Sequence, residues 1–194
     1  MTDTRPSGSN VSIALLHYPV YDKNRRVVAT AVTNLDIHDI ARLAKTFGLF
    51  RYFVVTPIEE QRILAERILS HWQEGWGASY NPTRRAAFDL LRVAPDLDTV
   101  LKDLENTYQR PAKIVVTGAR TGRDNIIKSS GLRQLLHDRE QPFLLLFGTG
   151  WGLTDELFNQ ADFILEPIRG SGDYNHLSVR TAAAIILDRL LGDR

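Results

Sequence analysis

The sequence contains no cysteine, and this absence excludes several kinds of chemistry at once. Without thiols the chain can form no disulfide, no thiolate metal site and no cysteine nucleophile. Histidine is also sparse: His17, His38, His71, His137 and His176 are scattered, without the paired spacing that metal ligands show. We therefore expect no bound metal, and we interpret His38, His71 and His137 as structural or solvated.

Long apolar runs and a strong excess of one charge are missing as well. No run approaches the roughly 20 apolar residues of a membrane span, and the net charge of the 194 residues is only +1. Residues 1–10 lack the apolar stretch of a signal peptide and are predicted to be a disordered tail. We expect a cytoplasmic protein with one domain over residues 11–194, in which any affinity for nucleic acid comes from a local basic patch.

Familiar catalytic motifs are also lacking. The sequence has no Walker A segment, no G-x-S-x-G and no H-E-x-x-H. Residues 148–153 read G-x-G-x-G-L, which lacks the third glycine of the dinucleotide-binding fingerprint at its required place. The segment also lies late in the chain, whereas that fingerprint occupies the first strand–helix turn. Rossmann-type NAD binding is therefore disfavoured, and the plain alternative is a tight turn in which Trp151 packs as an anchor.

What the sequence does contain is a regular alternation of short apolar runs and longer amphipathic ones. The apolar runs are continuous, as in strands buried on both faces, and strands are predicted at 12–18, 27–32, 52–56, 113–118, 143–148 and 162–167. Helices are predicted at 36–47, 58–71, 82–91, 96–108, 131–137 and 154–159, with a further apolar helix near the C-terminus. Asn81 before Pro82, and Asp96, are typical N-cap residues. The pattern predicts an α/β fold with a mostly parallel sheet flanked by helices on both sides.

Three consecutive predicted strands end in polar loops that contain glycine. These loops occupy residues 117–123, 148–152 and 166–172. Ligands of parallel sheets bind beyond the carboxyl ends of the strands, and glycine lets the backbone approach a ligand closely. Three such loops on successive strands predict one shared pocket.

The stretches VVTGAR, LLLFGTGWGL and LEPIRGSGDYNHLSVRTAAAIIL resemble, in this order, the three C-terminal motifs of the SPOUT superfamily of RNA methyltransferases. The N-terminal part, with LLHYPVYDKN, is similar to a bacterial branch of that superfamily, so that the resemblance covers almost the whole chain. It implies the α/β-knot fold, with a deep C-terminal trefoil knot over about residues 113–192. The glycines that flank the last loop, Gly170 and Gly172, and the small side chains of 182–184 are compatible with that threading.

The resemblance also implies an enzyme that methylates a base or a ribose of tRNA or rRNA with S-adenosylmethionine bound in the knot. It implies a homodimer whose final helices contribute to the interface. The implied cofactor-binding residues are Thr117, Gly118, Phe147, Gly148, Gly150, Gly152, Ile168, Gly170, Leu177 and Ser178. For the apolar three of these, at 147, 168 and 177, a plain core position is the alternative.

Two residues near the last helix are the candidates for catalysis. Asp173 is the candidate general base, with a turn-forming role as its alternative. Arg180 is the candidate for holding a phosphate or a base, and because a cation in a first helical turn opposes the helix dipole, a fixed anionic partner is expected. Asn175 or His176 would cap this helix.

Where the wider superfamily has a glutamate in the middle loop and an asparagine and a serine at the start of the last helix, this chain has Thr149-Gly150-Trp151 and Ser178 with Arg180. The difference leaves the target atom open. His17 and Tyr18 follow the first predicted strand and are candidates for the substrate side.

Basic residues supply the candidate contacts to RNA phosphates. They are Arg120, Arg123, Arg84, Arg85, Lys23 and Arg26, the last two in a basic, hairpin-like loop. For each of them alone, a solvated surface position is the alternative. Two further hypotheses stay open: a module of the same fold that binds RNA or cofactor without turnover, and an unrelated α/β nucleotide-binding enzyme without a knot.

Overall fold

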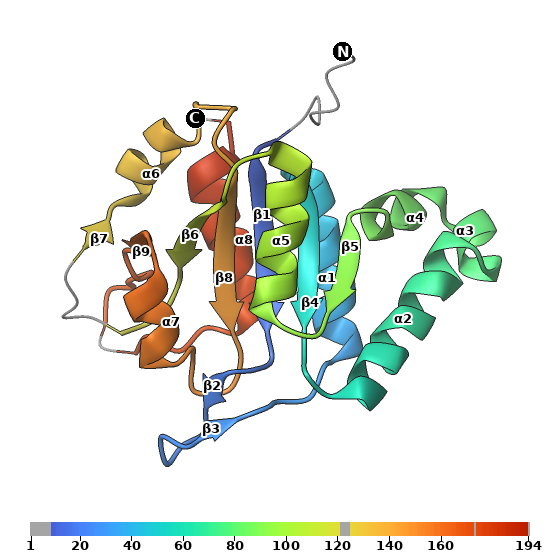
Figure 1. Ribbon diagram of the computed structural model, residues 1–194, viewed down its shortest axis with the longest axis horizontal. Helices are drawn as coiled ribbons and strands as arrows, with labels where there is room; N and C mark the ends of the chain where they lie inside the picture. The colour runs from blue at the N-terminus through green and yellow to red at the C-terminus, as the bar shows by residue number, and fades with distance from the viewer. Residues whose placement is uncertain (1–8, 121–124, 173, 194) are drawn as a thin grey trace.

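The computed structural model describes residues 9–120, 125–172 and 174–193. At its centre lies a seven-stranded sheet in the order β5-β4-β1-β8-β6-β9-β7, in which every neighbouring pair is parallel (Figure 1). The strands are β1 (Val11–Leu16), β4 (Arg51–Val55), β5 (Leu91–Ala94), β6 (Lys113–Val116), β7 (Ile126–Ile127), β8 (Phe143–Gly148) and β9 (Phe163–Leu165). The predicted parallel α/β sheet is confirmed.

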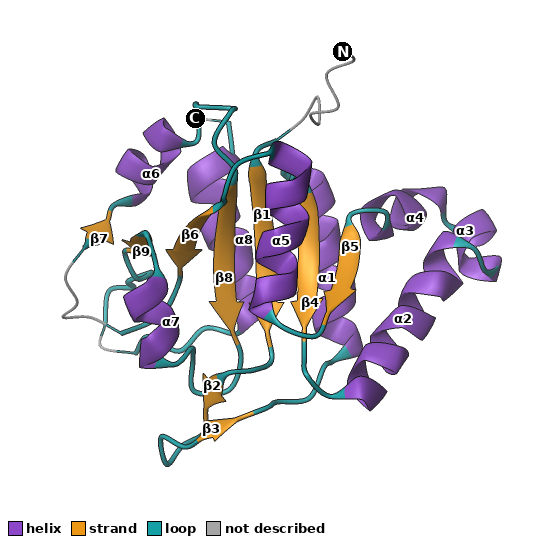
Figure 2. Cartoon of the chain, in the orientation of Figure 1, coloured by secondary structure: helices purple, strands orange, loops and turns teal. Residues whose placement is uncertain are grey.

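Helices cover both faces of this sheet (Figure 2). They are α1 (Asn34–Thr46), α2 (Glu59–Gln73), α3 (Trp76–Tyr80), α4 (Pro82–Phe88), α5 (Leu97–Tyr108), α6 (Ser129–Leu135), α7 (Asp155–Gln160) and α8 (Val179–Leu191). One core cluster joins the sheet to α1, α2, α4, α6 and α8, and a second joins the other face to α5 and α7. Because both faces are covered, the residues of β1 are all buried, which explains its continuous apolar run.

Helix start signals in the sequence were read correctly at two places and wrongly at a third. The Asn81 side chain accepts a hydrogen bond from Arg84 N (3.0 Å), and the Asp96 side chain accepts one from Thr99 N (2.7 Å), so both predicted caps are confirmed. Helix α8, however, is capped by Ser178 and not by the two residues proposed at 175 and 176. The Asn175 amide instead donates to the carbonyl oxygen of Ala119 (3.1 Å), which ties the last loop to the loop after β6.

The strand predicted at 27–32 is largely wrong. Only β3 (Val27–Val28) is extended in a ladder there, and it pairs antiparallel with β2 (Val20–Tyr21) in a small hairpin outside the main sheet. The following backbone finds other partners, since Thr30 N donates to the His17 carbonyl oxygen and Val32 N donates to Gln61 Oε1. The expectation of a basic, hairpin-like loop is confirmed.

Besides β2, three short elements were not predicted, namely β5, α3 and β7. Helix α4 ends at Phe88 and not at 91, because Leu91 begins the edge strand β5. The two-residue strand β7 and the five-residue helix α3 are too short to produce a readable apolar period. None of the described helices is long and apolar enough to cross a membrane.

Candidate functional site

A cavity of ≈ 490 Å³ lies where the loops after β6, β8 and β9 meet, as the sequence predicts for three glycine-bearing loops. Its lining includes all the predicted cofactor-binding residues except Gly170, namely Thr117, Gly118, Phe147, Gly148, Gly150, Gly152, Ile168, Leu177 and Ser178. Two further elements complete the wall. One is the segment between β3 and α1, and the other is the start of α8. The loops are therefore brought together, while cofactor binding by each residue stays a prediction.

The middle loop is held in a shape that requires glycine at two positions. Gly150 has a φ of +58°, and a Cβ atom there would lie 3.0 Å from the Tyr21 carbonyl oxygen. At Gly148 a Cβ atom would lie 2.7 Å from Leu153 Cγ. The β2–β3 hairpin fixes this loop from outside, since Trp151 N donates to the Tyr21 carbonyl oxygen (2.9 Å). The loop backbone is thus a preformed wall of the cavity.

Trp151 itself does not pack as an anchor. Its residue surface is 63% exposed, and it lines the cavity. The plain interpretation of the middle loop as a turn fixed by a packed indole is therefore wrong. An indole displayed at the wall of a cavity offers a flat apolar surface to a ligand.

The apolar part of the wall suits the adenosine portion of the predicted cofactor. Phe147 is only 2% exposed and belongs to the core, as its alternative interpretation says, although it also borders the cavity. Leu177 is 45% exposed and Ile168 is half-buried, so these two side chains have surface left for a ligand. The volume falls within the usual range for small-molecule pockets, roughly 300–1,000 Å³. Size and apolar lining, beside glycine loops that bring backbone groups to the wall, fit an adenosine-bearing group.

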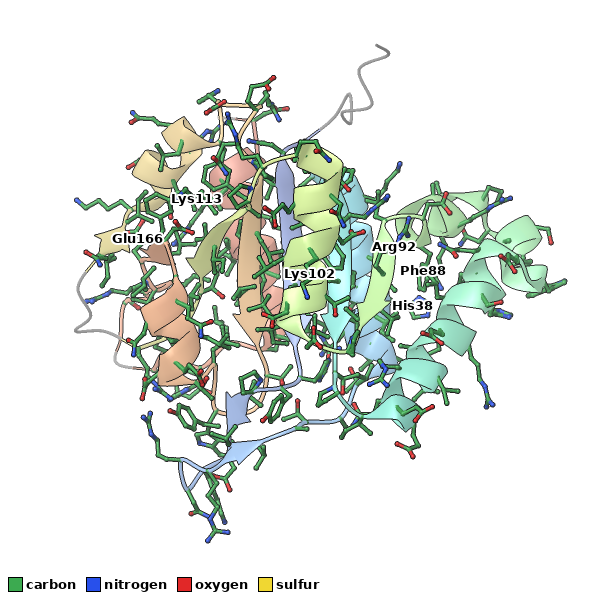
Figure 3. The ribbon with its side chains drawn as sticks, viewed as in Figure 1. His38, Phe88, Arg92, Lys102, Lys113 and Glu166 are labelled. Atoms are coloured by element: carbon green, nitrogen blue, oxygen red, sulfur yellow. The ribbon has the colours of Figure 1, made fainter. Side chains whose placement is uncertain are left out.

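Two carboxylates among the described lining residues escaped the sequence reasoning. Glu166 Oε1 accepts a hydrogen bond from Ser129 N (2.7 Å), which lowers the pKa of this carboxyl group and stabilises the start of α6. Figure 3 labels Glu166 near β7 and β9. At the start of α1 the hydroxyl of the N-cap residue Thr33 accepts a hydrogen bond from Asp36 N (3.1 Å) and donates one to Asp36 Oδ2 (2.7 Å). The T-x-x-D pattern is readable as a helix start, but nothing in it shows that α1 begins at the cavity.

Arg180 has the anionic partners that its place in a first helical turn demands. Its Nε lies 3.7 Å from Asp36 Oδ1 and 3.8 Å from Asp39 Oδ2, across the gap between α8 and α1. Arg180 itself is not among the described residues that line the cavity. The other catalytic candidate, Asp173, lies outside the described residues, as does Arg123.

His17 lies behind the cavity wall. Its imidazole is fully buried, and its Nδ1 pairs with the hydroxyl of Thr30 (3.1 Å), which in turn pairs with the hydroxyl of Thr149. Burial lowers the pKa of His17 to about 4, so the ring is neutral at physiological pH. Neither His17 nor Tyr18 lines the cavity within the described part of the chain.

Three histidines, His38, His71 and His137, were interpreted as structural or solvated, and the first of them is structural. His38 packs edge-on against Trp72 and Phe88, with ring centroids 5.4 and 4.8 Å away, on the side of the molecule remote from Glu166 (Figure 3). His71 also contacts Trp72 edge-on. In the described ranges no group of three or more histidine, aspartate and glutamate side chains is placed to hold a metal ion.

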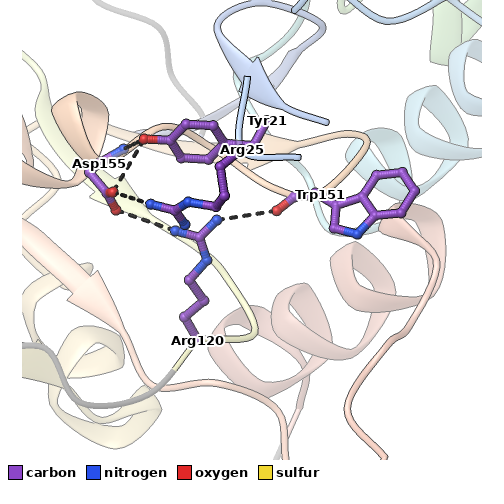
Figure 4. Close-up of polar contacts among 5 residues, drawn as sticks. All are labelled: Tyr21, Arg25, Arg120, Trp151 and Asp155. Carbon is purple, nitrogen blue, oxygen red and sulfur yellow. Dashed lines mark hydrogen bonds and ion pairs between the residues drawn. The ribbon is translucent and has the colours of Figure 1, made fainter. Parts of the chain in front are cut away.

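The predicted RNA-contacting residues fall into two groups. Arg120 lies at the cavity end of the sheet, where its guanidinium and that of Arg25 from the hairpin both contact the carboxylate of Asp155, at 3.3 and 2.6 Å (Figure 4). Both guanidinium groups also lie over the Tyr21 ring. Lys23 is exposed in the same hairpin. This end of the molecule thus gathers basic side chains around one carboxylate.

Arg26 is exposed beside Lys23 and belongs to the same group. Arg84 and Arg85 do not. They lie on α4, beyond the edge strand β5 and far from the hairpin (Figure 1), and the Arg84 guanidinium stacks over Trp72. The structure therefore separates the basic residues that the sequence treats as one set.

Comparisons with known proteins agree with this geometry. A family model described as SAM-dependent RNA methyltransferase matches residues 10–192. A tRNA (guanine-N(1)-)-methyltransferase of Oleidesulfovibrio alaskensis is 49% identical over 193 residues, which are 99% of this chain but 44% of that protein. A protein of Aquifex aeolicus without an assigned function is 47% identical over 181 residues, and the match covers 93% of this chain and 88% of that one.

Among solved structures, the SpoU methyltransferase AviRb of Streptomyces viridochromogenes, in complex with AdoMet, superposes with a TM-score of 0.60. It is 18% identical, and the match covers 98% of this chain and 60% of that chain. At this identity the likeness speaks for the fold. The chain spans less than half the length of the Oleidesulfovibrio relative, so that the activity in that relative's name belongs to a longer protein.

Proposed function

We propose that this chain, which belongs to the family of S-adenosylmethionine-dependent RNA methyltransferases, is of SPOUT type and methylates a base or a ribose of tRNA or rRNA. The observation that carries the proposal is the cavity itself. Three strand-end loops converge on a space of ≈ 490 Å³ whose lining includes the residues predicted to bind the cofactor, apart from Gly170. S-adenosylmethionine supplies a methyl group that is already activated by its sulfonium charge, so the protein's task is to bind and to orient.

The chain's own groups divide this task. Backbone groups of the loops at 117–119 and 147–153 would hold the adenosine portion, with Ile168 and Leu177 against the ring. Rigid glycine turns at 148 and 150 support this role, because a preformed wall loses little entropy when a ligand binds. Ser178 combines two roles in the proposal, since it caps α8 and also borders the cavity.

The RNA is proposed to approach across the hairpin end of the sheet. There Arg120, Lys23 and Arg26 would contact phosphates, with Arg123 in the adjoining loop. Trp151 would stack on a base at the cavity wall. Arg84 and Arg85 would form a separate, more distant contact for a large RNA.

Arg180 and Asp173 stay candidates for catalysis. Arg180 is proposed to hold a phosphate or a base near the start of α8, where its Nε lies 3.7 Å from Asp36 Oδ1. Asp173 stays in the proposal as the general base that the sequence suggests, on the basis of its place in the glycine-bearing loop that precedes α8.

Three architectural features belong to the same proposal. We infer one domain over residues 11–194, a trefoil knot over about 113–192 and a cytoplasmic homodimer. The knot is supported by the way the segment after β9 returns to the cavity and continues into α8, which packs beside both α1 and α6. The dimer is supported by the resemblance and by apolar residues of the α8 region that retain partial exposure, such as Leu191.

The names of two relatives specify the methylated atom, guanine N1 of tRNA, whereas this proposal does not specify the atom. The guanine-N1 activity is printed for proteins of which this chain matches 44%, whereas the Aquifex relative matches over most of its own length. A segment of this size therefore also occurs with little added sequence. We keep tRNA as the first substrate to test and leave the position open.

The test begins with calorimetric titration of the purified protein with S-adenosylmethionine. Expected is saturable binding together with a raised thermal midpoint. Transfer of a tritiated methyl group to bulk tRNA and to bulk rRNA then distinguishes an enzyme from a binding module of the same fold. Mass spectrometry of nucleosides from cells with and without the protein identifies the product. Absence of cofactor binding at millimolar concentration would refute the proposal, and binding without transfer to either RNA would favour the module.

A further inference from the structure

Asp36 lies in a part of the cavity wall that is distinct from the three glycine loops. Together with Thr30, Ala31 and Thr33 it forms the side contributed by the segment between β3 and α1 and by the first turn of α1. Its side chain is only 13% exposed, yet it borders the cavity. Asp36 is thus a largely buried carboxylate at the border of the ligand space.

Both oxygens of this carboxylate are oriented by neighbours on different elements. Oδ2 accepts a hydrogen bond from Thr33 Oγ1 (2.7 Å), and Oδ1 lies 3.7 Å from Arg180 Nε on α8. The other charged or titratable neighbours are Asp39 on α1, the buried His17 at the end of β1, and Tyr52 on β4, whose hydroxyl donates to the Asp36 carbonyl oxygen. The group is thus fixed in place beside one guanidinium, a condition for accepting a proton in a defined direction.

Glu166, the second carboxylate in the described lining, is occupied differently. It accepts the backbone N–H of Ser129, and its loss would leave the start of α6 without this bond. Among the described residues, the Asp36 carboxylate accepts a hydrogen bond from the Thr33 hydroxyl at the start of its own helix and forms an ion pair of 3.7 Å with Arg180 Nε. Of the two carboxylates, Asp36 is therefore the one that can accept a proton from a ligand without losing a backbone hydrogen bond to another helix.

We infer that Asp36, in place of the sequence candidate Asp173, is the proton acceptor for the nucleotide that becomes methylated, an inference that otherwise rests on the proposed function. The target nitrogen or oxygen gives its proton to the Asp36 carboxylate, and the electron pair so released forms the bond to the methyl carbon. The electrons of the broken methyl–sulfur bond stay on sulfur, which leaves as a neutral thioether. The proton passes from Asp36 to water when the product departs. The neighbouring Arg180 then faces the regenerated carboxylate.

The experiment compares Asp36→Asn with Asp39→Asn. Asp39 is a close control, because it lies on the same helix and near the same guanidinium (3.8 Å), but its side chain is 47% exposed and does not line the cavity. Asparagine preserves the size of the side chain and can still accept the Thr33 hydrogen bond. Binding of S-adenosylhomocysteine by calorimetry, binding of RNA and the thermal midpoint are measured beside single-turnover methyl transfer.

For Asp36→Asn we expect a loss of transfer rate of about 100-fold or more, as is typical when a general base is removed. Affinities for S-adenosylhomocysteine and RNA should stay within about twofold, and Asp39→Asn should stay within about threefold of wild type, as expected for groups away from the transferred proton. The deficit of Asp36→Asn should shrink as pH rises, because hydroxide then removes the proton, whereas a structural defect would lower the rate equally at all pH values. Asp36→Glu, which restores a carboxylate, should recover part of the rate.

Equal losses in both asparagine variants, a wild-type rate in Asp36→Asn, or a loss of S-adenosylhomocysteine affinity that matches the loss of rate would each overturn the inference. If Asp36→Asn does not fold, the glutamate variant decides through its pH dependence. Failure of the wild-type chain to bind S-adenosylhomocysteine would instead count against the proposed function, so that the two failures are distinguishable.

Discussion

Arg25 donates a hydrogen bond of 2.6 Å to the Asp155 carboxylate, 130 residues further along the chain. The contact joins the β2–β3 hairpin to the first turn of α7, and Arg120 reaches the same carboxylate from the loop after β6. One acid therefore holds together two of the basic elements that the proposed RNA path requires. The pair is partly exposed, so that its contribution to stability is small, on the order of 1 kcal/mol or less.

Asp155→Asn should therefore strengthen RNA binding modestly. Removing the carboxylate leaves both guanidinium groups available to phosphates, and we expect affinity to rise by up to about fivefold, with a steeper salt dependence. The measurement is filter binding of tRNA between low and physiological salt. Asp103→Asn, which removes the same charge from an exposed position on α5, is the control and should have less effect. A weaker complex would mean that Asp155 orients the two arginines towards RNA and does not compete with phosphates for them.

Trp151→Ala should weaken RNA binding while leaving the fold intact. The side chain is largely exposed, so little packing is lost, and base–aromatic stacking is worth about 1–3 kcal/mol. We expect an affinity loss of about tenfold or more, measured by fluorescence anisotropy with labelled tRNA. Trp76→Ala is matched in chemistry and exposure (68%) but lies on α3, away from the cavity, and should change affinity little. If the cofactor affinity falls and the RNA affinity does not, the indole contacts the cofactor.

The sequence predicts most of the sheet because its signals there are local. A strand buried on both faces must be apolar throughout, and the loops after β6, β8 and β9 carry glycines that mark their exceptional backbone. The cavity-lining loops were found in this way, without knowledge of the strand order. The hairpin was found as a loop but its strands were not, since β2 and β3 contribute only two residues each.

Contacts between distant segments had no such local signal. Asp36 reads as an ordinary capping residue until α1 is placed beside α8, where Arg180 approaches it. In the sequence the basic residues at 84 and 85 look equivalent to Arg120. In the structure they lie on α4, beyond the edge strand β5, and are therefore distant from Arg120. The sequence therefore predicts the local structure and burial of each segment, whereas the strand order decides which segments come into contact.

Gly150→Ala should lower both stability and cofactor affinity. A left-handed conformation costs an alanine about 1–2 kcal/mol, and its Cβ atom would press on the Tyr21 carbonyl oxygen at 3.0 Å. Urea denaturation should show this loss, with weaker S-adenosylmethionine binding in calorimetry because the loop wall shifts. Gly170→Ala is the control, since no heavy atom lies within 4 Å of its added Cβ, and its stability should match wild type. Equal stability of both variants would show that the middle loop adapts freely.

The buried His17 should make the protein less stable in mildly acidic solution. Its pKa is about 4 in the folded protein against 6.5 when unfolded, so only the unfolded chain takes up this proton between those values. The stabilising effect of the neutral ring is therefore complete above pH 6.5 and disappears as the pH falls towards 4. A difference of about 2.5 pKa units corresponds to on the order of 3 kcal/mol over this window.

His17→Gln should flatten this part of the stability curve, because glutamine takes up no proton. The variant loses stability at neutral pH, where the Thr30 hydrogen bond and the packing of the ring are disturbed, but its free energy of unfolding should vary less between pH 6.5 and 4 than that of wild type. Urea unfolding at several pH values measures both effects. His38, whose pKa burial also lowers, accounts for the slope that remains in this variant. An unchanged slope in His17→Gln would mean that this ring becomes protonated in the folded protein, with its unpaired Nε2 finding water behind the cavity wall.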